Sequence, residues 1–315
     1  MAAAARRQPR PQKGDYMYYL LVLLTGMTLA VMISINGFLT QAVGIYLSAV
    51  IIHIVGSAFA GILVFSRRRQ QKPVEWKKIP FWQYLGGAIG VFVTMCNNIS
   101  FGRISMTSIV ALGLLGQTAA ALAIDCFGLF GMPKHPFRLS SLPGLLLSLA
   151  GIGMMLDPAA AAASAAVILS LTAGIGVVLN RTVNARISDR IGALRGSLMN
   201  HLTGLPITIL LACVVFLTRG TASFSVRPFP LWVLTGGILG VMVVVLCNLT
   251  VPHVAAFRLT MITFVSQMMT GVLLDLILGK GSVDPTFWGG LVIAAGVVVS
   301  LIMEHMPGSR KQPAA

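Results

Sequence analysis

Polar side chains that can pass protons or form hydrogen bonds recur in pairs inside otherwise apolar stretches of this chain. The pairs are His53 and His201, Asn98 and Asn248, Gln117 and Gln267, Asn36 and Asn184, and Asp125 and Asp275. A histidine can titrate near neutral pH, so the histidine pair suits proton exchange. The amides can line a polar cavity, and ionisable groups in such apolar stretches are costly and usually functional.

The pairing reflects an internal duplication of the whole chain. Residues 80–125 match residues 230–275 at a constant offset of 150, and the identities include Pro80, Trp82 and their counterparts Pro230 and Trp232. Around the histidines the offset is 148. Apolar composition alone would not place Trp, Asn, Gln and Asp in register. Such self-similarity at a fixed distance is the signature of a repeated structural unit.

The composition is that of a polytopic membrane protein. Hydrophobic residues make up 56% and charged residues 10% of the chain, whereas soluble domains carry about 25% charged residues. A bilayer is crossed by about 20 apolar residues. Spans are expected at residues 16–35, 44–65, 82–100, 104–127, 143–156, 165–183, 192–217, 231–250, 254–278 and 286–303, with Asn36-Gly37 ending or breaking the first.

The duplication divides these spans into two sets of five. We expect a basic tail at 1–15, repeat 1 at 16–156, a linker at 157–164, repeat 2 at 165–304 and a tail at 305–315. Five is odd, so the second repeat enters the membrane upside down. The predicted fold is all-α, with ten transmembrane helices as two inverted five-helix repeats.

Charge placement predicts the orientation. With the N-terminus inside, 19 Lys and Arg residues fall on inner segments and 4 on outer loops. Inner loops of membrane proteins are enriched in Lys and Arg, so both termini are expected in the cytoplasm. The net charge of +15 is therefore assigned to these loops and not to nucleic-acid binding.

Three segments carry a resemblance to a known family. They are GIGVVLNRTVNARISDRIGALRGSLMNHLTG (174–204), PLWVLTGGILGV (230–241) and the two Gln-x7-Asp pairs. With them the chain resembles the bacterial YdcZ-like inner-membrane family of the drug/metabolite transporter superfamily, as two fused five-helix units. The first half departs from the pattern, with SING at 34–37 where the second has TVNA at 182–185. The resemblance implies a bacterial inner-membrane protein of transporter class and leaves its substrate undefined.

Inverted repeats build many secondary transporters, with the substrate bound near the midplane between the halves. The expected function is export or import of a small molecule by alternating access, with proton coupling as one option. The paired histidines and amides are the candidates for substrate binding or coupling, and Asp125 and Asp275, near opposite faces, are the candidate gates.

Alternatives remain for each candidate. The histidines and amides can serve as hydrogen-bonded packing residues between helices, which would fit a non-transporting membrane scaffold or partner subunit. The acids can serve as interfacial anchors, Asp125 paired with Lys134 or Arg138 and Asp275 with Lys280. The GxxxG motifs at Gly86/Gly90 and Gly236/Gly240 are expected to let helices approach closely.

The sequence favours no enzyme. It contains no Gly-x-Ser-x-Gly motif, no Walker loop and no metal-ligand cluster, so neither a cofactor nor a metal is expected. The four cysteines lie in or at the ends of apolar spans without paired spacing, and no disulfide is expected. They are Cys96, Cys126, Cys213 and Cys247.

Overall fold

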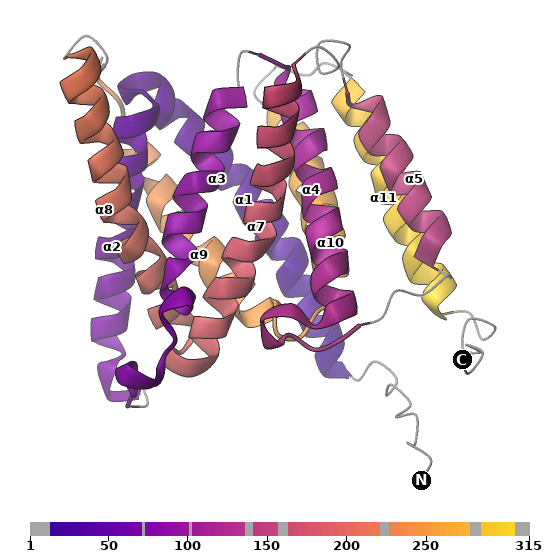
Figure 1. Cartoon of the computed structure of the whole chain (residues 1–315), viewed down its shortest axis with the longest axis horizontal. Coiled ribbons are helices and arrows are strands. Elements are labelled where there is room, and N and C mark those ends of the chain that lie inside the picture. The colour runs from indigo at the N-terminus through magenta and orange to yellow at the C-terminus, as the bar shows by residue number, and fades with distance from the viewer. Residues whose placement is uncertain are drawn as a thin grey trace.

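The computed structural model describes residues 13–70, 73–100, 103–135, 141–156, 163–220, 227–277 and 285–305, and its regular secondary structure is helical apart from single-residue bridges. The helices of repeat 1 are α1 (Lys13–Val43), α2 (Ile45–Ser66), α3 (Gly86–Ser100), α4 (Met106–Phe127) and α5 (Leu142–Met154). Those of repeat 2 are α7 (Ser164–Ile191), α8 (Ala193–Arg219), α9 (Thr235–Thr250), α10 (Ala256–Ile277) and α11 (Pro285–His305). Figure 1 shows them side by side as a broad bundle.

Seven stretches of the described residues are long and apolar enough to cross a membrane: 16–43, 45–66, 108–127, 164–191, 193–219, 231–250 and 256–274. The predicted spans at 82–100, 143–156 and 286–303 are not among them. Helix α5 has 13 residues, which at 1.5 Å per residue is about 20 Å, short of the roughly 30 Å hydrocarbon core. The part of α11 that qualifies as an apolar helix is Phe287–Ser300.

The structure corrects the predicted ends of the first and sixth spans. Asn36-Gly37 does not break the first helix, because α1 continues to Val43, and α7 runs on to Ile191. Glycine within a helix costs only about 1 kcal/mol, which tertiary packing offsets. The chain instead turns at Gly44 (φ 79°) and Gly192 (φ 92°). These equivalent glycines take backbone angles that other residues rarely adopt.

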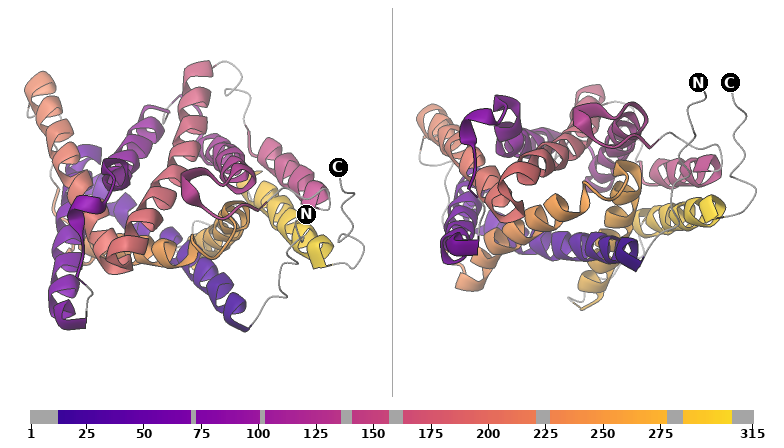
Figure 2. Two further views of the ribbon diagram at one scale, coloured as in Figure 1. Left: turned by 60° about the horizontal axis from the view of Figure 1, so that its bottom comes forward. Right: turned by 90° about the horizontal axis from the view of Figure 1, so that it is seen from below.

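The two repeats are interwoven. Helix α1 packs on α9 and α10, and its equivalent α7 packs on α3 and α4. The equivalents α2 and α8 pack on each other, as do α4 and α10, and α5 and α11. Figure 1 shows α1 beginning at the lower end of the view and α7 at the upper end, so equivalent helices run in opposite directions. The turned views in Figure 2 show α5 and α11 together at one side of the bundle.

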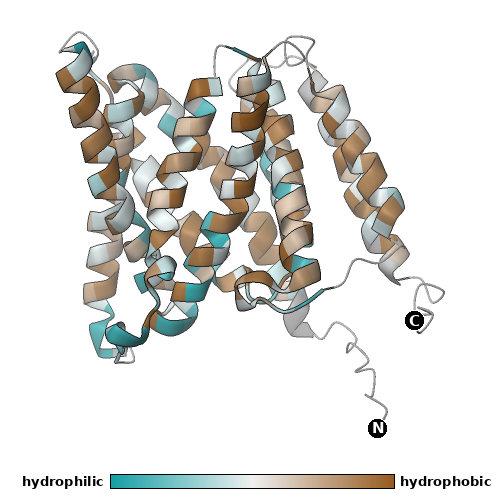
Figure 3. Ribbon diagram, in the orientation of Figure 1, coloured by the Kyte–Doolittle hydropathy of each residue, from teal (hydrophilic) through white to brown (hydrophobic). Residues whose placement is uncertain are grey.

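Glycines allow the closest of these crossings. A Cβ placed on Gly174 of α7 would lie 2.0 Å from the carbonyl oxygen of Gly113 in α4, and one on Gly26 of α1 would lie 2.4 Å from that of Thr263 in α10. These crossings are equivalent and both depend on the missing side chain. Hydrophobic residues make up most of each helix, and hydrophilic residues gather at the lower end of the bundle (Figure 3).

The predicted tails and linker fall largely outside the described residues. Of the tail at 1–15, residues 13–15 form the first turn of α1, and α7 begins at Ser164 within the predicted linker. Residues 306–315 are not among those described.

Candidate functional site

The two equivalent histidines meet between the repeats. His53 on α2 and His201 on α8 have ring centroids 5.9 Å apart, with ring planes inclined by 55°. His201 is buried and His53 is half-buried. Since one residue of each repeat contributes, the axis that relates the halves passes close to this pair.

Hydrogen bonds fix the protonation pattern of each ring. His53 Nδ1 lies 2.8 Å from the carbonyl oxygen of Ala49, and His201 Nδ1 lies 2.9 Å from that of Ser197. A carbonyl can only accept, so Nδ1 donates and Nε2 carries the lone pair in a neutral ring. Among the described residues, no hydrogen-bond partner lies at either Nε2. Each Nε2 can therefore take up a proton or accept from a ligand.

Glycines of the opposite repeat make room for the rings. A Cβ on Gly204 would lie 2.4 Å from Nε2 of His53, and one on Gly56 would lie 2.2 Å from Cδ2 of His201. Gly56 and Gly204 are themselves equivalent positions. The reciprocal fit places each histidine against the helix that carries the other.

Beside the histidines, three asparagines form a hydrogen-bonded cluster on α7 and α8. Asn184 Nδ2 donates to Oδ1 of Asn180 at 3.2 Å and to Oδ1 of Asn200 at 2.8 Å. Asn180 Nδ2 donates to the carbonyl of Gly86 on α3 at 2.5 Å. This close approach requires glycine at position 86, because a Cβ there would lie 2.1 Å from Oδ1 of Asn184.

The equivalent place in the other half is less polar. Asn36 on α1 faces Gly236 on α9, where a Cβ would lie 2.0 Å from Asn36 Oδ1. Within the described part of the chain, that buried oxygen has no hydrogen-bond partner. At the 148-residue offset, Met32 and Ile52 stand where repeat 2 has Asn180 and Asn200.

The remaining predicted amides lie at other crossings. Asn248 on α9 is buried and donates to the carbonyl of Ala193 at the start of α8, at 3.0 Å. The half-buried Gln117 and Gln267 lie where α4 meets α7 and α10 meets α1, each with its backbone N–H against a glycine. The structure thus brings His53 and His201 together, and places these amides elsewhere. The side chains of Asn98 and Asp275 lie outside the described residues.

Asp125 does not pair with Lys134 as the anchor interpretation expects. Its Oδ1 accepts from the backbone N–H of Ala256 and its Oδ2 from that of Phe257, both at 2.8 Å. These are the first two residues of α10. The carboxylate at the end of α4 therefore caps a helix of the other repeat, where the positive end of the helix dipole stabilises it. Arg138, the other expected partner, lies outside the described residues.

Arg181 is a candidate that the sequence interpretation missed. It lies within α7 with 7% of its surface exposed, and its Nη2 donates to the carbonyl of Ala256 at 3.3 Å and to the hydroxyl of Thr260. The sequence feature that points to it is an arginine inside a 28-residue helix apolar enough to cross a membrane. Arginine so placed usually marks function.

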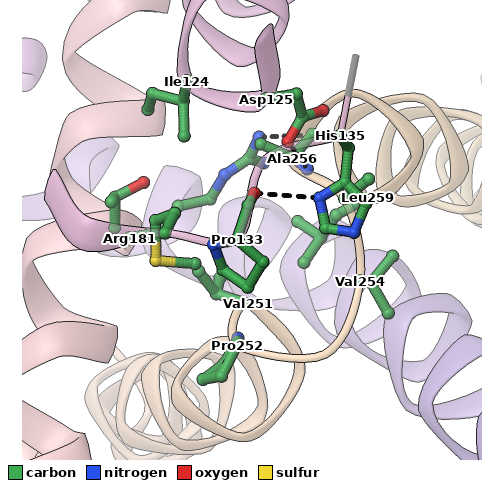
Figure 4. Close-up of a pocket in the computed structure, with 13 residues that line it drawn as sticks. Ile124, Asp125, Pro133, His135, Arg181, Val251, Pro252, Val254, Ala256 and Leu259 are labelled. Atoms are coloured by element: carbon green, nitrogen blue, oxygen red, sulfur yellow. Dashed lines mark hydrogen bonds between the residues drawn. The ribbon is translucent and has the colours of Figure 1, made fainter. Parts of the chain in front are cut away.

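Asp125 and Arg181 share a small cavity with His135 (Figure 4). It is closed by apolar side chains of α4, α10 and the segment before α10, including Ile124, Val254 and Leu259. A second small cavity lies between α5, α10 and α11, lined by Ser148, Arg258 and Ser300 among others. In the described residues, no group of three or more His, Cys, Asp or Glu could hold a metal ion.

Comparison with known proteins matches both halves to one family. The family model described as "Putative inner membrane exporter, YdcZ" matches residues 17–154 and again residues 165–300. No curated protein matches the chain. A solved structure named "Crystal structure of protein" superposes with a TM-score of 0.68 at 16% sequence identity, over 94% of this chain and 100% of that one. At this identity the likeness shows a shared fold.

Proposed function

The chain belongs to the YdcZ inner-membrane exporter family, twice over in one polypeptide, and we propose that it moves a small molecule by alternating access between two inverted halves. The observation that carries this proposal is the meeting of His53 and His201, one from each repeat, at 5.9 Å. Two equivalent groups at the junction of the halves can exchange roles when the halves exchange conformations.

The interwoven packing supports movement of this kind. Helices of one repeat pack on those of the other, since α1 packs on α9 and α10 while α7 packs on α3 and α4. In an inverted pair, a movement that opens one end has an equivalent that opens the other. We propose that all ten helices act in this way, including α3, α5 and α11, which are not among the seven apolar spans.

The histidine pair is the proposed coupling site. Both Nε2 atoms carry a lone pair in the neutral state, and a histidine can change charge near neutral pH. Two protonated rings this close would repel each other. We propose that the pair takes up at most one proton beyond those on the two Nδ1 atoms, and passes this added proton between the two sides.

The contact of Asp125 with α10 is the proposed gate at the lower end in Figure 1. It joins α4 of repeat 1 to α10 of repeat 2 through two hydrogen bonds, and breaking it frees the end of α4 from the start of α10. The lower end also holds the start of α1 and the end of α11. From the charge asymmetry we assign this end to the cytoplasm and the gate to cytoplasmic opening.

The test is transport by the purified protein in liposomes. A mixture of amino acids, nucleosides, sugars and amines is sealed inside, and the released molecules are identified by mass spectrometry with and without a pH gradient. We expect release of at least one compound, faster with the gradient. Replacing both histidines, His53→Gln with His201→Gln, should abolish the effect of the gradient at an unchanged protein level.

A packing role for the histidines predicts the opposite result, namely lower thermal stability and normal pH dependence in the protein that survives. A matched control is Asn248→Ala, which removes a buried polar group away from the pair. It should lower stability and leave the response to the gradient intact. Release equal to that of protein-free liposomes for every compound would contradict transport and favour the scaffold alternative.

A further inference from the structure

We propose that the α10 N-terminus and Arg181 form an oxyanion site, occupied here by Asp125, and that the transported molecule carries a carboxylate or phosphate group that exchanges with it. This inference rests on the proposed transport function and gives it a substrate class. It concerns a site at one end of the bundle, separate from the histidine pair.

The Asp125 carboxylate shows what the site accepts. Its two oxygens are held one each by the N–H groups of Ala256 and Phe257, both at 2.8 Å. Two parallel N–H groups at the positive end of a helix dipole are a general arrangement for binding anions. A carboxylate or phosphate of another molecule presents the same pair of oxygens.

Arg181 supplies an independent reason to expect an anion. The guanidinium is 7% exposed and has five N–H donors, yet within the described residues only its Nη2 finds acceptors, Ala256 and Thr260. No carboxylate of the described residues lies within ion-pair distance of it. Asp125 acts on this guanidinium electrostatically without contacting it, so an anion in direct contact would offset more of the cost of burying the cation. The free donors belong to a side chain that lines the cavity beside Asp125 (Figure 4).

The hydrogen-bond donors of the cavity favour an anion over a cation. Among the described residues, Asp125 is its one acidic lining residue, and the N–H groups of α10 already engage both carboxylate oxygens. Arg181 and the ring of His135 line the same space. His135 directs its Nδ1 to the carbonyl of Pro133 at 3.0 Å, so the ring is held in place by its own loop.

The equivalent position in the other half is not built this way. At the 148-residue offset, Ile33 replaces Arg181, and Ile33 is 47% exposed. The site is therefore a property of one end of the molecule and not a consequence of the duplication. An anion that displaces Asp125 there would release α4 from α10, so binding of the substrate would itself open the gate.

The first experiment is chemical rescue of Asp125→Ala. Removing the carboxylate leaves space that formate fills, since formate is the group removed. The purified variant in detergent should unfold at a temperature about 4 °C below wild type. Sodium formate should recover most of that shift, and neither sodium chloride at equal ionic strength nor formamide, its neutral counterpart, should do so.

Arg181 decides whether the rescue reports the proposed site. In Asp125→Ala/Arg181→Gln the recovery by formate should be lost. If that double variant yields no folded protein, Asp125→Ala/Arg181→Lys replaces it and should need at least a fivefold higher formate concentration for half recovery. The proposal would be overturned if formamide restored as much stability as formate, or if formate restored none. It would also be overturned if the formate concentration for half recovery did not depend on residue 181.

The second experiment identifies the source of the oxyanion. Liposomes are loaded with matched small carboxylates, phosphate monoesters, amides and amines, and we expect release only of the anions, dependent on Arg181. Release of only amides or amines would overturn the inference and leave transport standing. Rescue by formate with no released compound would keep the site and contradict the proposed function. The wild type is also compared in phosphatidylglycerol and phosphatidylcholine nanodiscs. Stabilisation that depends on Arg181 and appears only in phosphatidylglycerol would assign the site to a lipid headgroup. This result would overturn the proposed substrate class.

Discussion

The two halves of this molecule place the same glycines against different side chains. Where α3 meets α7 and α8, Gly86 and Gly90 face the asparagines Asn184 and Asn180. Where α9 meets α1 and α2, the equivalent Gly236 faces Asn36. A Cβ added to Gly240 would lie 3.4 Å from Nε2 of His201 and 3.7 Å from the sulfur of Met32. We call these the asparagine-rich seam and the asparagine-poor seam.

The difference shows which features the architecture requires and which are free to change. Both seams keep the glycines, because helices cross there too closely for side chains. Both also keep one asparagine, but only Asn184 has hydrogen-bond partners, whereas Asn36 Oδ1 has none in the described residues. A backbone that is nearly symmetric thus carries different side chains at its two equivalent seams.

The ends of α4 and α10 repeat this contrast. Ser105 caps α4 from within its own helix, accepting from the N–H of Ser108 at 3.1 Å. Ala255 stands at the equivalent position before α10 and has no side chain that could cap, so Asp125 of the other repeat does so. One cap is local and the other joins the two repeats.

The largest expected loss of stability comes from replacing a glycine of each seam with alanine. Gly87→Ala places a Cβ 2.1 Å from the backbone oxygen of Asn200, whereas Gly237→Ala places one 2.9 Å from that of Ile52. Backbone cannot yield as a side chain can, so Gly87→Ala should cost about 3 kcal/mol and Gly237→Ala about 1 kcal/mol. Thermal unfolding in detergent measures both. Equal losses would mean that the seams are equally tight.

The next effect compares the two caps. Asp125→Ala removes two hydrogen bonds from a charged group and should cost about 2 kcal/mol, while Ser105→Ala removes one neutral bond and should cost about 1 kcal/mol. Hydrogen exchange gives a second readout, since exchange should rise at the start of α10 in the first variant and of α4 in the second. Unchanged exchange at Ala256 and Phe257 in Asp125→Ala would contradict the cap between repeats.

The smallest effect concerns the asparagines. Asn184→Ala leaves Asn180 Oδ1 without a donor and Asn200 Oδ1 with only the 3.4 Å bond from Asn180 Nδ2, and it should cost about 1 kcal/mol. Asn36→Ala removes an oxygen that has no partner in the described residues, and stability should stay within about 0.5 kcal/mol of wild type. Chemical denaturation of the two variants side by side provides the measurement. A larger loss from Asn36→Ala would show that its oxygen is satisfied in the folded protein.

Much of this arrangement could be predicted from the duplication. Equivalence of His53 and His201 in the sequence already suggested that they share a role, and two interwoven halves bring them together. The helical continuation through Asn36-Gly37 could not be predicted, because a local turn signal is overruled by the fit of Asn36 against a glycine 200 residues away.

The charged site was less accessible to sequence reasoning. The partners of Asp125 are backbone N–H groups 131 and 132 residues away, and backbone groups leave no trace in residue type. Arg181 is visible in the sequence, but the positive-inside pattern assigns basic residues to loops, and only the packing of α7 shows that this one is buried.

The most direct test of alternating access uses pairs of spin labels at equivalent places on opposite ends. One pair is Phe127 and Leu249, at the lower ends of α4 and α9, and the other is Ile277 and Ile99, at the upper ends of α10 and α3; all four are exposed. Labels are attached through cysteines in a background whose four native cysteines are replaced. Distances are measured by double electron–electron resonance with and without Asp125→Ala.

Removing the Asp125 cap should open the lower end and, through the inverted symmetry, close the upper one. The account predicts that the distance between labels at 127 and 249 lengthens while that between 277 and 99 shortens. Ser105→Ala, which removes only a local cap, should not produce this opposite pair of changes. A change at the lower end with none at the upper end would show local fraying and would contradict alternating access.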